Sequence, residues 1–133
     1  MKANILVVDD DEGISYVIKR FLMQGGHEVS TAVDYNEAMD KLSLTDFDLV
    51  FTDINLGDRS GIDLLREVKK RKMACPVIMI TGNPNLDTAT DAIRLGAHDY
   101  IFKPVKITTL TRVTNLALKY KSVVQEKNRY QSN

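Results

Sequence analysis

Phe47-Asp48-Leu49-Val50-Phe51-Thr52-Asp53-Ile54-Asn55 is a short, mostly apolar run that carries one carboxylate, Asp53, near its end. Its residues favour β-structure, and a nearly continuous apolar run is typical of a strand that is covered on both faces. In open α/β sheets, ligands bind just outside the carboxyl ends of the strands. We therefore expect Asp53 at a functional edge of a sheet rather than in a core.

Outward from this strand, short apolar runs alternate with amphipathic segments along the whole chain. Further strands are predicted at residues 4–8, 28–32, 77–80 and 99–102. Helices are predicted after the N-cap Asp11, at 35–42, after the N-cap Ser60, from residue 86 to the stop at Gly96, and from residue 108 to about residue 130. The segment 55–59 is predicted to be a loop.

This alternation indicates an α/β fold. Strands and helices that alternate over short connections form right-handed crossovers, which makes all the strands parallel. We expect one five-stranded sheet with helices on both faces, a doubly wound (βα)5 arrangement. A chain of 133 residues has the size of one domain. We assign residues 1–120 to this domain and residues 121–133 to the projecting end of the last helix.

Composition narrows the class of protein. The chain is 44% hydrophobic and 27% charged, which is ordinary for a globular protein, and no apolar run is long enough to cross a bilayer. A single cysteine and the lack of a signal-peptide pattern favour the cytoplasm. Residues 100–133 carry seven basic side chains and one acidic one. They lack a nucleic-acid reading motif, so we expect a solvated helix that binds neither nucleic acid nor membrane.

Polar residues follow the predicted strands at the points where the strands end: Asp9 and Asp10, Asp53, Thr81, and Lys103. Because parallel strands share one carboxyl edge, we expect these side chains to meet. Clustered carboxylates repel one another unless a cation intervenes, and oxygen ligands with access to water suit Mg²⁺. An ammonium and a hydroxyl beside them can hold a phosphoryl group, and a carboxylate such as Asp53 can act as the nucleophile.

Four segments, taken together and in order, resemble the receiver domain of two-component response regulators: Val7-Val8-Asp9-Asp10-Asp11, Phe51-Thr52-Asp53, Thr81-Gly82, and Ala97-His98-Asp99-Tyr100-Ile101-Phe102-Lys103-Pro104. The resemblance extends over about residues 4–120. It implies a flavodoxin-like strand order, 2-1-3-4-5, and a cis peptide bond between Lys103 and Pro104.

The resemblance also implies roles for individual residues. Asp53 would accept a phosphoryl group from a sensor histidine kinase or a phosphotransfer protein, so the chain would be a signalling domain rather than an enzyme with a separate substrate. Asp10 and Asp53 would bind Mg²⁺ directly and Asp9 through water. Asn55 would add its backbone carbonyl, and Mn²⁺ is an alternative ion. Lys103 would pair with Asp53 or with its phosphoryl oxygens.

A conformational switch is implied as well. Thr81 would move its hydroxyl onto the phosphoryl group, and Tyr100 would rotate inward as Thr81 moves. Phosphorylation adds about −1.5 to −2 charge units, which would bias the loop 81–85. The face formed by the fourth helix, the fifth strand and the fifth helix would then contact an output domain in cis or a protein target. A homodimer through that face is a further expectation.

The last predicted helix carries apolar residues at coiled-coil spacing: Leu110, Val113, Ala117, Tyr120 and Val124. Residues 121–133 are therefore interpreted as a linker to an output domain beyond Asn133. The context would be the receiver of an AAA+ transcription activator or of a hybrid kinase.

Two other functions compete with this interpretation. A haloacid-dehalogenase-like phosphohydrolase would have a second aspartate two residues after the nucleophile, but Asn55 stands there and cannot act as a general acid. A degenerate receiver used only for protein binding would lack Asp9 or Asp10, Asp53, or Lys103, and all of them are present.

Overall fold

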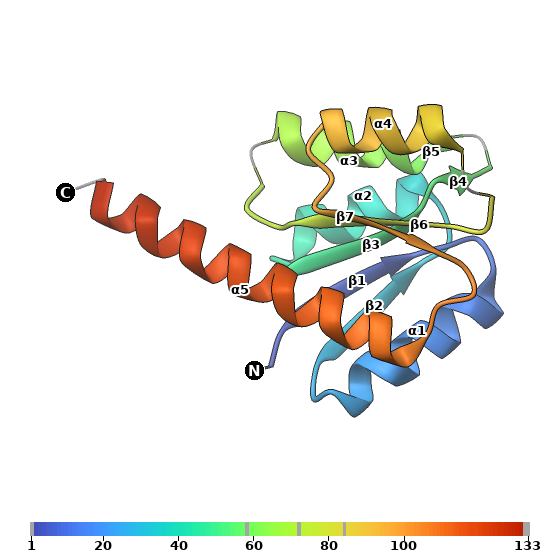
Figure 1. The fold of residues 1–133 in the computed structure, drawn as a ribbon, viewed down its shortest axis with the longest axis horizontal. Helices are drawn as coiled ribbons and strands as arrows, with labels where there is room; N and C mark the ends of the chain where they lie inside the picture. Colours follow the sequence, from blue (N-terminus) through green and yellow to red (C-terminus); the bar gives the residue numbers. More distant parts are fainter. Residues whose placement is uncertain (1, 58, 72, 84, 132–133) are drawn as a thin grey trace.

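The computed structural model describes residues 2–57, 59–71, 73–83 and 85–131, with the side chains of these residues up to 129. Its centre is a parallel sheet in the order β2-β1-β3-β6-β7 (Figure 1). These strands are β1 Asn4–Val8, β2 Glu28–Ala32, β3 Leu49–Asp53, β6 Val77–Thr81 and β7 Asp99–Phe102. With the short strands β4 and β5 set aside, the order is 2-1-3-4-5, so the predicted doubly wound fold is confirmed.

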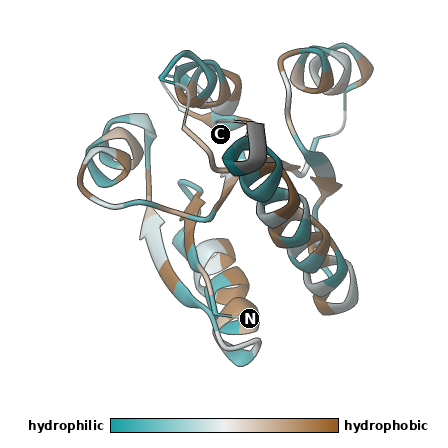
Figure 2. Ribbon diagram, turned by 90° about the vertical axis from the view of Figure 1, so that its left-hand side faces the viewer, coloured by the Kyte–Doolittle hydropathy of each residue, from teal (hydrophilic) through white to brown (hydrophobic). Residues whose placement is uncertain are grey.

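Helices cover both faces of the sheet: α1 Glu12–Gln24, α2 Tyr35–Leu44, α3 Gly61–Lys70, α4 Leu86–Arg94 and α5 Ile107–Gln131. Figure 1 shows α1 and α5 on one face and the other helices on the opposite face. In Figure 2 each helix carries hydrophobic as well as hydrophilic residues. This pattern is expected of helices that pack one side against a sheet and expose the other.

Strand β3 lies at the centre of the sheet because every one of its residues can be buried. Leu49, Val50 and Phe51 have no exposed surface. Leu49 and Phe51 belong to the apolar cluster under α1 and α5, whereas Val50 belongs to the cluster under α2, α3 and α4. The run of consecutive apolar residues therefore fills both cores, as a strand covered on both faces requires.

Local sequence signals set the ends of the helices. Asp11 caps α1 by accepting hydrogen bonds from the backbone N–H groups of Gly13 and Ile14. Ser60 caps α3 in a reciprocal capping box with Asp63. Both predicted N-caps are confirmed. Helix α2 ends at Leu44 rather than at residue 42, because the helical turn continues until Thr45 adopts an extended backbone.

The segment predicted as a loop after β3 contains a short antiparallel pair. Strands β4 (Asn55–Leu56) and β5 (Arg59–Ser60) pair with each other across a turn in which Gly57 has a φ of 80°. A left-handed φ favours glycine, which explains the residue type. Leu56 is buried in the core, a tertiary contact that an isolated loop sequence does not reveal. Asp58, part of the predicted loop, lies outside the described residues.

Helix α5 extends past the body of the domain on the side opposite the β4–β5 hairpin (Figure 1). Its 25 residues give a length of roughly 38 Å. Leu110, Val113 and Ala117 are buried against the sheet and therefore serve the core of this domain rather than a coiled coil. No helix in the described ranges is long and apolar enough to span a membrane.

Asp48 ties three elements together at the amino edge of the sheet. It immediately precedes β3, its Oδ1 accepts a hydrogen bond from Lys121 Nζ in α5 at 2.6 Å, and its Oδ2 accepts one from the backbone N–H of Asn4 at 2.8 Å. Burial alone would raise the pKa of Asp48, but the bonds from Lys121 and Asn4 outweigh burial and hold this pKa below its ordinary value. The stabilisation is therefore present above the ordinary pKa and is lost as the pH falls through the lowered one.

Asp48→Asn is expected to destabilise the protein by about 0.5–1 kcal/mol at neutral pH, a small effect because solvent screens this partly exposed carboxylate. The difference from the wild type should vanish in acid, at a pH below the lowered pKa of Asp48, where the wild-type carboxyl is also uncharged. Urea unfolding at both pH values measures it. Asp46→Asn, an exposed neighbour with no ion pair among the described residues, is the control. A difference that persists in acid would point to packing rather than charge.

Candidate functional site at the carboxyl edge of the sheet

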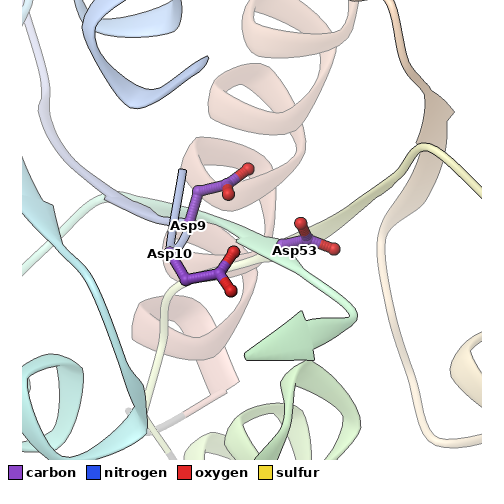
Figure 3. A group of neighbouring side chains, drawn as sticks. All are labelled: Asp9, Asp10 and Asp53. Atoms are coloured by element: carbon purple, nitrogen blue, oxygen red, sulfur yellow. The ribbon is translucent and has the colours of Figure 1, made fainter. Parts of the chain in front are cut away.

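Three carboxylates meet where two neighbouring strands end. Asp9 and Asp10 follow β1, and Asp53 is the last residue of β3, which pairs with β1. One oxygen from each carboxylate lies within 4.8 Å of the others, and Figure 3 shows the three side chains gathered together. Asp9 and Asp53 are buried, whereas Asp10 is exposed to solvent. The strand topology thus brings together side chains that lie far apart in the sequence.

Lys103 reaches this cluster from the end of β7. Its Nζ lies 2.7 Å from Asp53 Oδ2 and 2.9 Å from Asp9 Oδ2. Burial alone would lower the pKa of Lys103, but its contacts with Asp53 and Asp9 outweigh burial and leave this pKa above its ordinary value. The ammonium therefore stays protonated at neutral pH and offsets part of the repulsion between the carboxylates. The Lys103-Pro104 peptide bond is cis, as predicted.

Asp9 is the most deeply buried member, with 1% of its surface exposed. Its Oδ1 accepts a hydrogen bond from the backbone N–H of Asp11 at 2.9 Å. Its Oδ2 touches the Lys103 ammonium but accepts no well-directed hydrogen bond from any described residue. Burial raises the pKa of Asp9, so its ionised form carries an electrostatic cost. An under-coordinated carboxylate oxygen lies beside the buried Asp53 carboxylate and the exposed Asp10 carboxylate, and this set fits the hard oxygen coordination that Mg²⁺ prefers.

The backbone around Asp53 is held from two sides. Asp53 Oδ1 accepts a hydrogen bond from the N–H of Asn55 at 3.0 Å, which fixes the carboxylate relative to β4. The carbonyl oxygen of Asp53 accepts one from the Thr52 hydroxyl at 2.9 Å and lies directly against Gly61. Neither Thr52 nor Gly61 was predicted as a site residue from the sequence. A glycine in the first turn of a helix, where propensity disfavours it, is the signal that could have marked Gly61.

Thr81 is the last residue of β6 and Tyr100 lies within the neighbouring strand β7, and neither side chain bonds to Asp53. The Thr81 hydroxyl accepts a hydrogen bond from the backbone N–H of Asn83 at 3.1 Å and approaches the Asn83 carbonyl oxygen at 3.4 Å. The Tyr100 ring packs edge-on against Phe102, with centroids 5.4 Å apart. Its hydroxyl is buried without a well-directed partner among the described residues, and burial raises the pKa of Tyr100. Thr81 is therefore held by the loop after β6, and Tyr100 by its contact within β7.

An open apolar groove of 630 Å³ runs beside the acidic cluster, between α1 and the segment after β7. It is lined by Ile14, Val17 and Ile18 of α1 on one side and by Lys103, Pro104 and Val105 on the other. Val17 and the neighbouring Tyr16 are exposed. The groove therefore joins an exposed apolar surface directly to the lysine of the site.

The fold and the site together define a class: a flavodoxin-like α/β domain with an acidic, lysine-braced pocket at the carboxyl edge of its sheet. The chain belongs to the family of response regulator receiver domains, whose sequence model matches residues 5–115. It is thus a signalling domain of two-component systems.

Relatives and solved structures agree with this assignment. The chain is 34% identical over 117 residues to the transcriptional regulatory protein ZraR of Klebsiella oxytoca and 38% identical over 120 residues to the nitrogen assimilation regulatory protein NtrX of Azorhizobium caulinodans. These alignments cover 88% and 89% of this chain but only 26% of each relative, so the chain spans about a quarter of their length.

Among solved structures, the CheY-like receiver domain protein of Methanospirillum hungatei JF-1 is similar with a TM-score of 0.87 and 32% identity, over 92% of this chain and 98% of that one. NtrX of Brucella abortus in complex with ADP is similar with a TM-score of 0.91 and 40% identity, over 98% of this chain and 29% of that one. Both likenesses extend over nearly the whole of this chain.

Proposed function

We propose that Asp53 accepts a phosphoryl group, and that this modification switches the signalling state of the domain. The observation that carries the proposal is the position of the Asp53 carboxylate, which lies against the Lys103 ammonium and beside the carboxylates of Asp9 and Asp10. A nucleophilic oxygen, a fixed cation and a set of oxygen ligands are the groups that phosphoryl transfer needs for positioning and charge neutralisation.

Asp10 and Asp53 would hold Mg²⁺ directly, Asp9 would act through water, and Asn55 would add its backbone carbonyl. The ion would neutralise charge that develops on the phosphoryl oxygens, and Mn²⁺ would be an alternative. Asp9 and Lys103 would act from the buried side of the site. Their contact at 2.9 Å holds the ammonium where it can also reach the Asp53 carboxylate.

In the transfer itself, a carboxylate oxygen of Asp53 would attack phosphorus and form the new O–P bond. The P–N bond of a phosphohistidine would break at the same time, and its electron pair would leave on the imidazole nitrogen. The Lys103 ammonium would pair with one phosphoryl oxygen and stabilise its negative charge during the transfer. The donor would belong to a sensor histidine kinase or a phosphotransfer protein in the cytoplasm. The groove beside α1 would receive the donor protein, because it opens next to Lys103.

The test is incubation of the whole chain with phosphoramidate and Mg²⁺, followed by intact-mass measurement. We expect the mass of one phosphoryl group to be added, and addition to fall at least about tenfold when EDTA removes the ion, because the ion supplies much of the charge neutralisation. A matched sample with EDTA and excess Mg²⁺ is the control. Equal phosphorylation with and without the divalent ion would contradict the assigned role of the carboxylate cluster.

Phosphorylation would then act through Thr81 and Tyr100. A phosphoryl group on Asp53 offers new acceptors to the Thr81 hydroxyl, which now pairs with Asn83. Movement of Thr81 would free space for Tyr100 to turn further inward, and the face of α4, β7 and α5 would change its shape. That face would control an output domain in cis or a protein target, or form a homodimer. Beyond this self-modification, the domain would turn over no substrate of its own.

Residues 121–133 would form a linker to an output domain, as in an AAA+ activator or, as an alternative, a hybrid kinase. In the described part of the projecting helix, Leu116, Tyr120 and Val123 are exposed at helical spacing and offer an apolar stripe. The core residues of α5 lie on another side, so the stripe is free to meet a second copy.

Removing residues 121–133 is expected to weaken self-association of the chain by at least about tenfold, because it deletes part of this stripe and shortens the helix. Sedimentation equilibrium of the full chain and of the truncated chain measures the effect. Circular dichroism checks that the truncated domain remains folded. An unchanged oligomeric state would argue against a coiled-coil linker, and the phosphoacceptor proposal would be unaffected.

A further inference from the structure

Gly61 is the first residue of α3 and lies against the backbone of the proposed phosphoacceptor. A Cβ atom added to Gly61 would fall 2.1 Å from the carbonyl oxygen of Asp53, 3.0 Å from its carbonyl carbon and 3.1 Å from Thr52 Oγ1. All three distances are shorter than ordinary van der Waals contact, and two of them involve backbone atoms that cannot turn aside. Any larger residue at position 61 must therefore move α3 or the end of β3.

Space, and not backbone conformation, explains this glycine. Among the described residues, left-handed φ angles occur at Gly26, Gly57 and Gly96, and Gly61 is not among these positions. Glycine also lowers the propensity for helix at the start of α3, where alanine would be preferred. Helix propensity and dihedral angles thus give no reason for glycine here, whereas the approach to Asp53 does.

The contact is part of a clamp around the end of β3. The N–H of Gly61 donates a hydrogen bond to the Ile54 carbonyl at 2.6 Å, and the Thr52 hydroxyl donates one to the Asp53 carbonyl at 2.9 Å. The N–H of Asn55 donates to the Asp53 carboxylate itself at 3.0 Å. The two peptide groups that follow Asp53 are therefore held by hydrogen bonds to α3, to the Thr52 hydroxyl and to the Asp53 carboxylate.

Helix α3 cannot yield easily to relieve a clash. Its start is fixed by the capping box of Ser60 and Asp63, and its inner side is buried through Ile62, Leu64 and Leu65. The chain after Asp53 can adjust more easily, because it leaves the central sheet after the bond from the Ile54 N–H to the Ile80 carbonyl and enters the β4–β5 hairpin. A methyl group at position 61 would thus displace Asp53 and Asn55, the residues proposed to bind the phosphoryl group and the ion.

We propose that Gly61 is a positioning residue for phosphoryl transfer, which holds the Asp53 carboxylate and the Asn55 backbone in register with Lys103 and Asp9. This inference rests on the phosphoacceptor role proposed for Asp53. A displacement of about 1 Å at a reacting group can cost about a hundredfold in rate, because the reacting atoms lose their alignment. Thr52 supports the same carbonyl through its hydroxyl and is the second positioning residue of the clamp.

The test compares Gly61→Ala with Gly25→Ala in the whole chain. Gly25 follows α1 at the amino edge of the sheet, away from the site, and a Cβ there would lie 3.3 Å from the Leu22 carbonyl oxygen, so this variant is the control for a tight backbone contact elsewhere in the fold. Single-turnover phosphorylation by phosphoramidate is measured over a range of Mg²⁺ concentrations, well below the unfolding temperature of each variant. We expect Gly61→Ala to lower the rate at saturating Mg²⁺ by about 10- to 100-fold and to weaken Mg²⁺ binding, with Gly25→Ala close to the wild type.

Two further measurements separate positioning from stability. The backbone amide of Asn55 reports its hydrogen bond to Asp53 in ¹H–¹⁵N NMR spectra, and its resonance should shift in Gly61→Ala but not in Gly25→Ala. If Gly61→Ala fails to fold, two variants of Thr52 test the clamp instead. Thr52→Val, which lacks the hydroxyl, should phosphorylate several-fold more slowly at saturating Mg²⁺, and Thr52→Ser should restore the rate.

The outcomes are distinct. A folded Gly61→Ala variant with the wild-type rate and an unshifted Asn55 amide would overturn the inference. If that variant does not fold, equal rates for Thr52→Val and the wild type would overturn it. Failure of the wild-type chain to accept a phosphoryl group would instead remove the proposed function on which the inference rests.

Discussion

Asp53→Asn is expected to abolish the acyl phosphate, a loss of at least about 10³-fold in the rate of phosphoryl incorporation, because an essential nucleophile is removed. The carboxamide keeps the shape of the side chain, and its oxygen can still accept the hydrogen bond from Asn55. It lacks the negative charge that faces Lys103 at 2.7 Å, and an amide oxygen is a far weaker nucleophile than a carboxylate. Function should therefore be lost while the fold is retained.

Intact mass after treatment with phosphoramidate and Mg²⁺ measures the loss. Hydroxylamine then identifies the linkage, since it releases a phosphoryl group from a carboxylate but leaves hydroxyl esters intact. Asp46→Asn, which removes an exposed carboxylate away from the site, should incorporate as much as the wild type. A hydroxylamine-sensitive phosphoryl group on the Asp53→Asn variant would assign the phosphoacceptor to another carboxylate, with Asp9 and Asp10 as the neighbours to examine.

Lys103→Met should lower the phosphorylation rate by about 10²–10³-fold, the usual cost of deleting one fixed donor that stabilises developing negative charge. Methionine retains most of the apolar length of the side chain and removes only the ammonium. Asp9 and Asp53 then lose the cation that both now contact. The affinity for Mg²⁺ is expected to stay the same or rise, because no ammonium competes with the ion for these carboxylates.

A lower rate without a loss of Mg²⁺ affinity makes this variant informative. Single-turnover phosphorylation gives the rate, and calorimetric titration with Mg²⁺ gives the affinity. Lys106→Met removes an exposed lysine in the same segment after β7, three residues beyond Lys103. This control variant should change neither the rate nor the affinity. A wild-type rate in Lys103→Met would show that the ammonium serves only to balance charge in the resting protein.

The site contains a buried carboxyl group, Asp9, whose ionisation lowers the stability of the fold. Burial raises the pKa of Asp9, so the ionised form of this carboxyl costs the folded protein stability. A carboxyl group whose pKa is raised in the folded state makes its own contribution to stability at low pH. That contribution is lost as the pH rises through the raised pKa. A bound cation or the Lys103 ammonium reduces this cost. Such a trade of stability for a charged, pre-organised pocket is common at functional sites.

The caps of the helices were predictable because they depend on short-range chemistry. A side-chain oxygen at Asp11 or Ser60 finds backbone N–H groups two or three residues away, whatever the rest of the chain does. The meeting of Asp9, Asp53 and Lys103 was predictable for a different reason. Once strands alternate with helices, parallel pairing places every strand end at one edge, and the residues that follow the strands must gather there.

Other features depended on contacts that no local pattern encodes. The β4–β5 pair forms where Leu56 finds a place in the core, and the steric role of Gly61 exists only because α3 begins against the Asp53 carbonyl. In α5, Leu110 and Tyr120 share the same apolar spacing in the sequence, yet the first is buried by the sheet and the second is exposed. Periodicity identifies a helical face but not the partner that covers it.

By itself, then, the sequence determined the five strands of the parallel sheet, the helix caps and the set of polar residues that follow those strands. These properties arise from residue types and spacings along a chain. Only the tertiary structure decided which oxygen of Asp53 meets Lys103, how closely Gly61 approaches the phosphoacceptor strand, and which face of α5 remains uncovered. Such distances result from the packing of whole elements against one another, and close packing converts them into fixed positions.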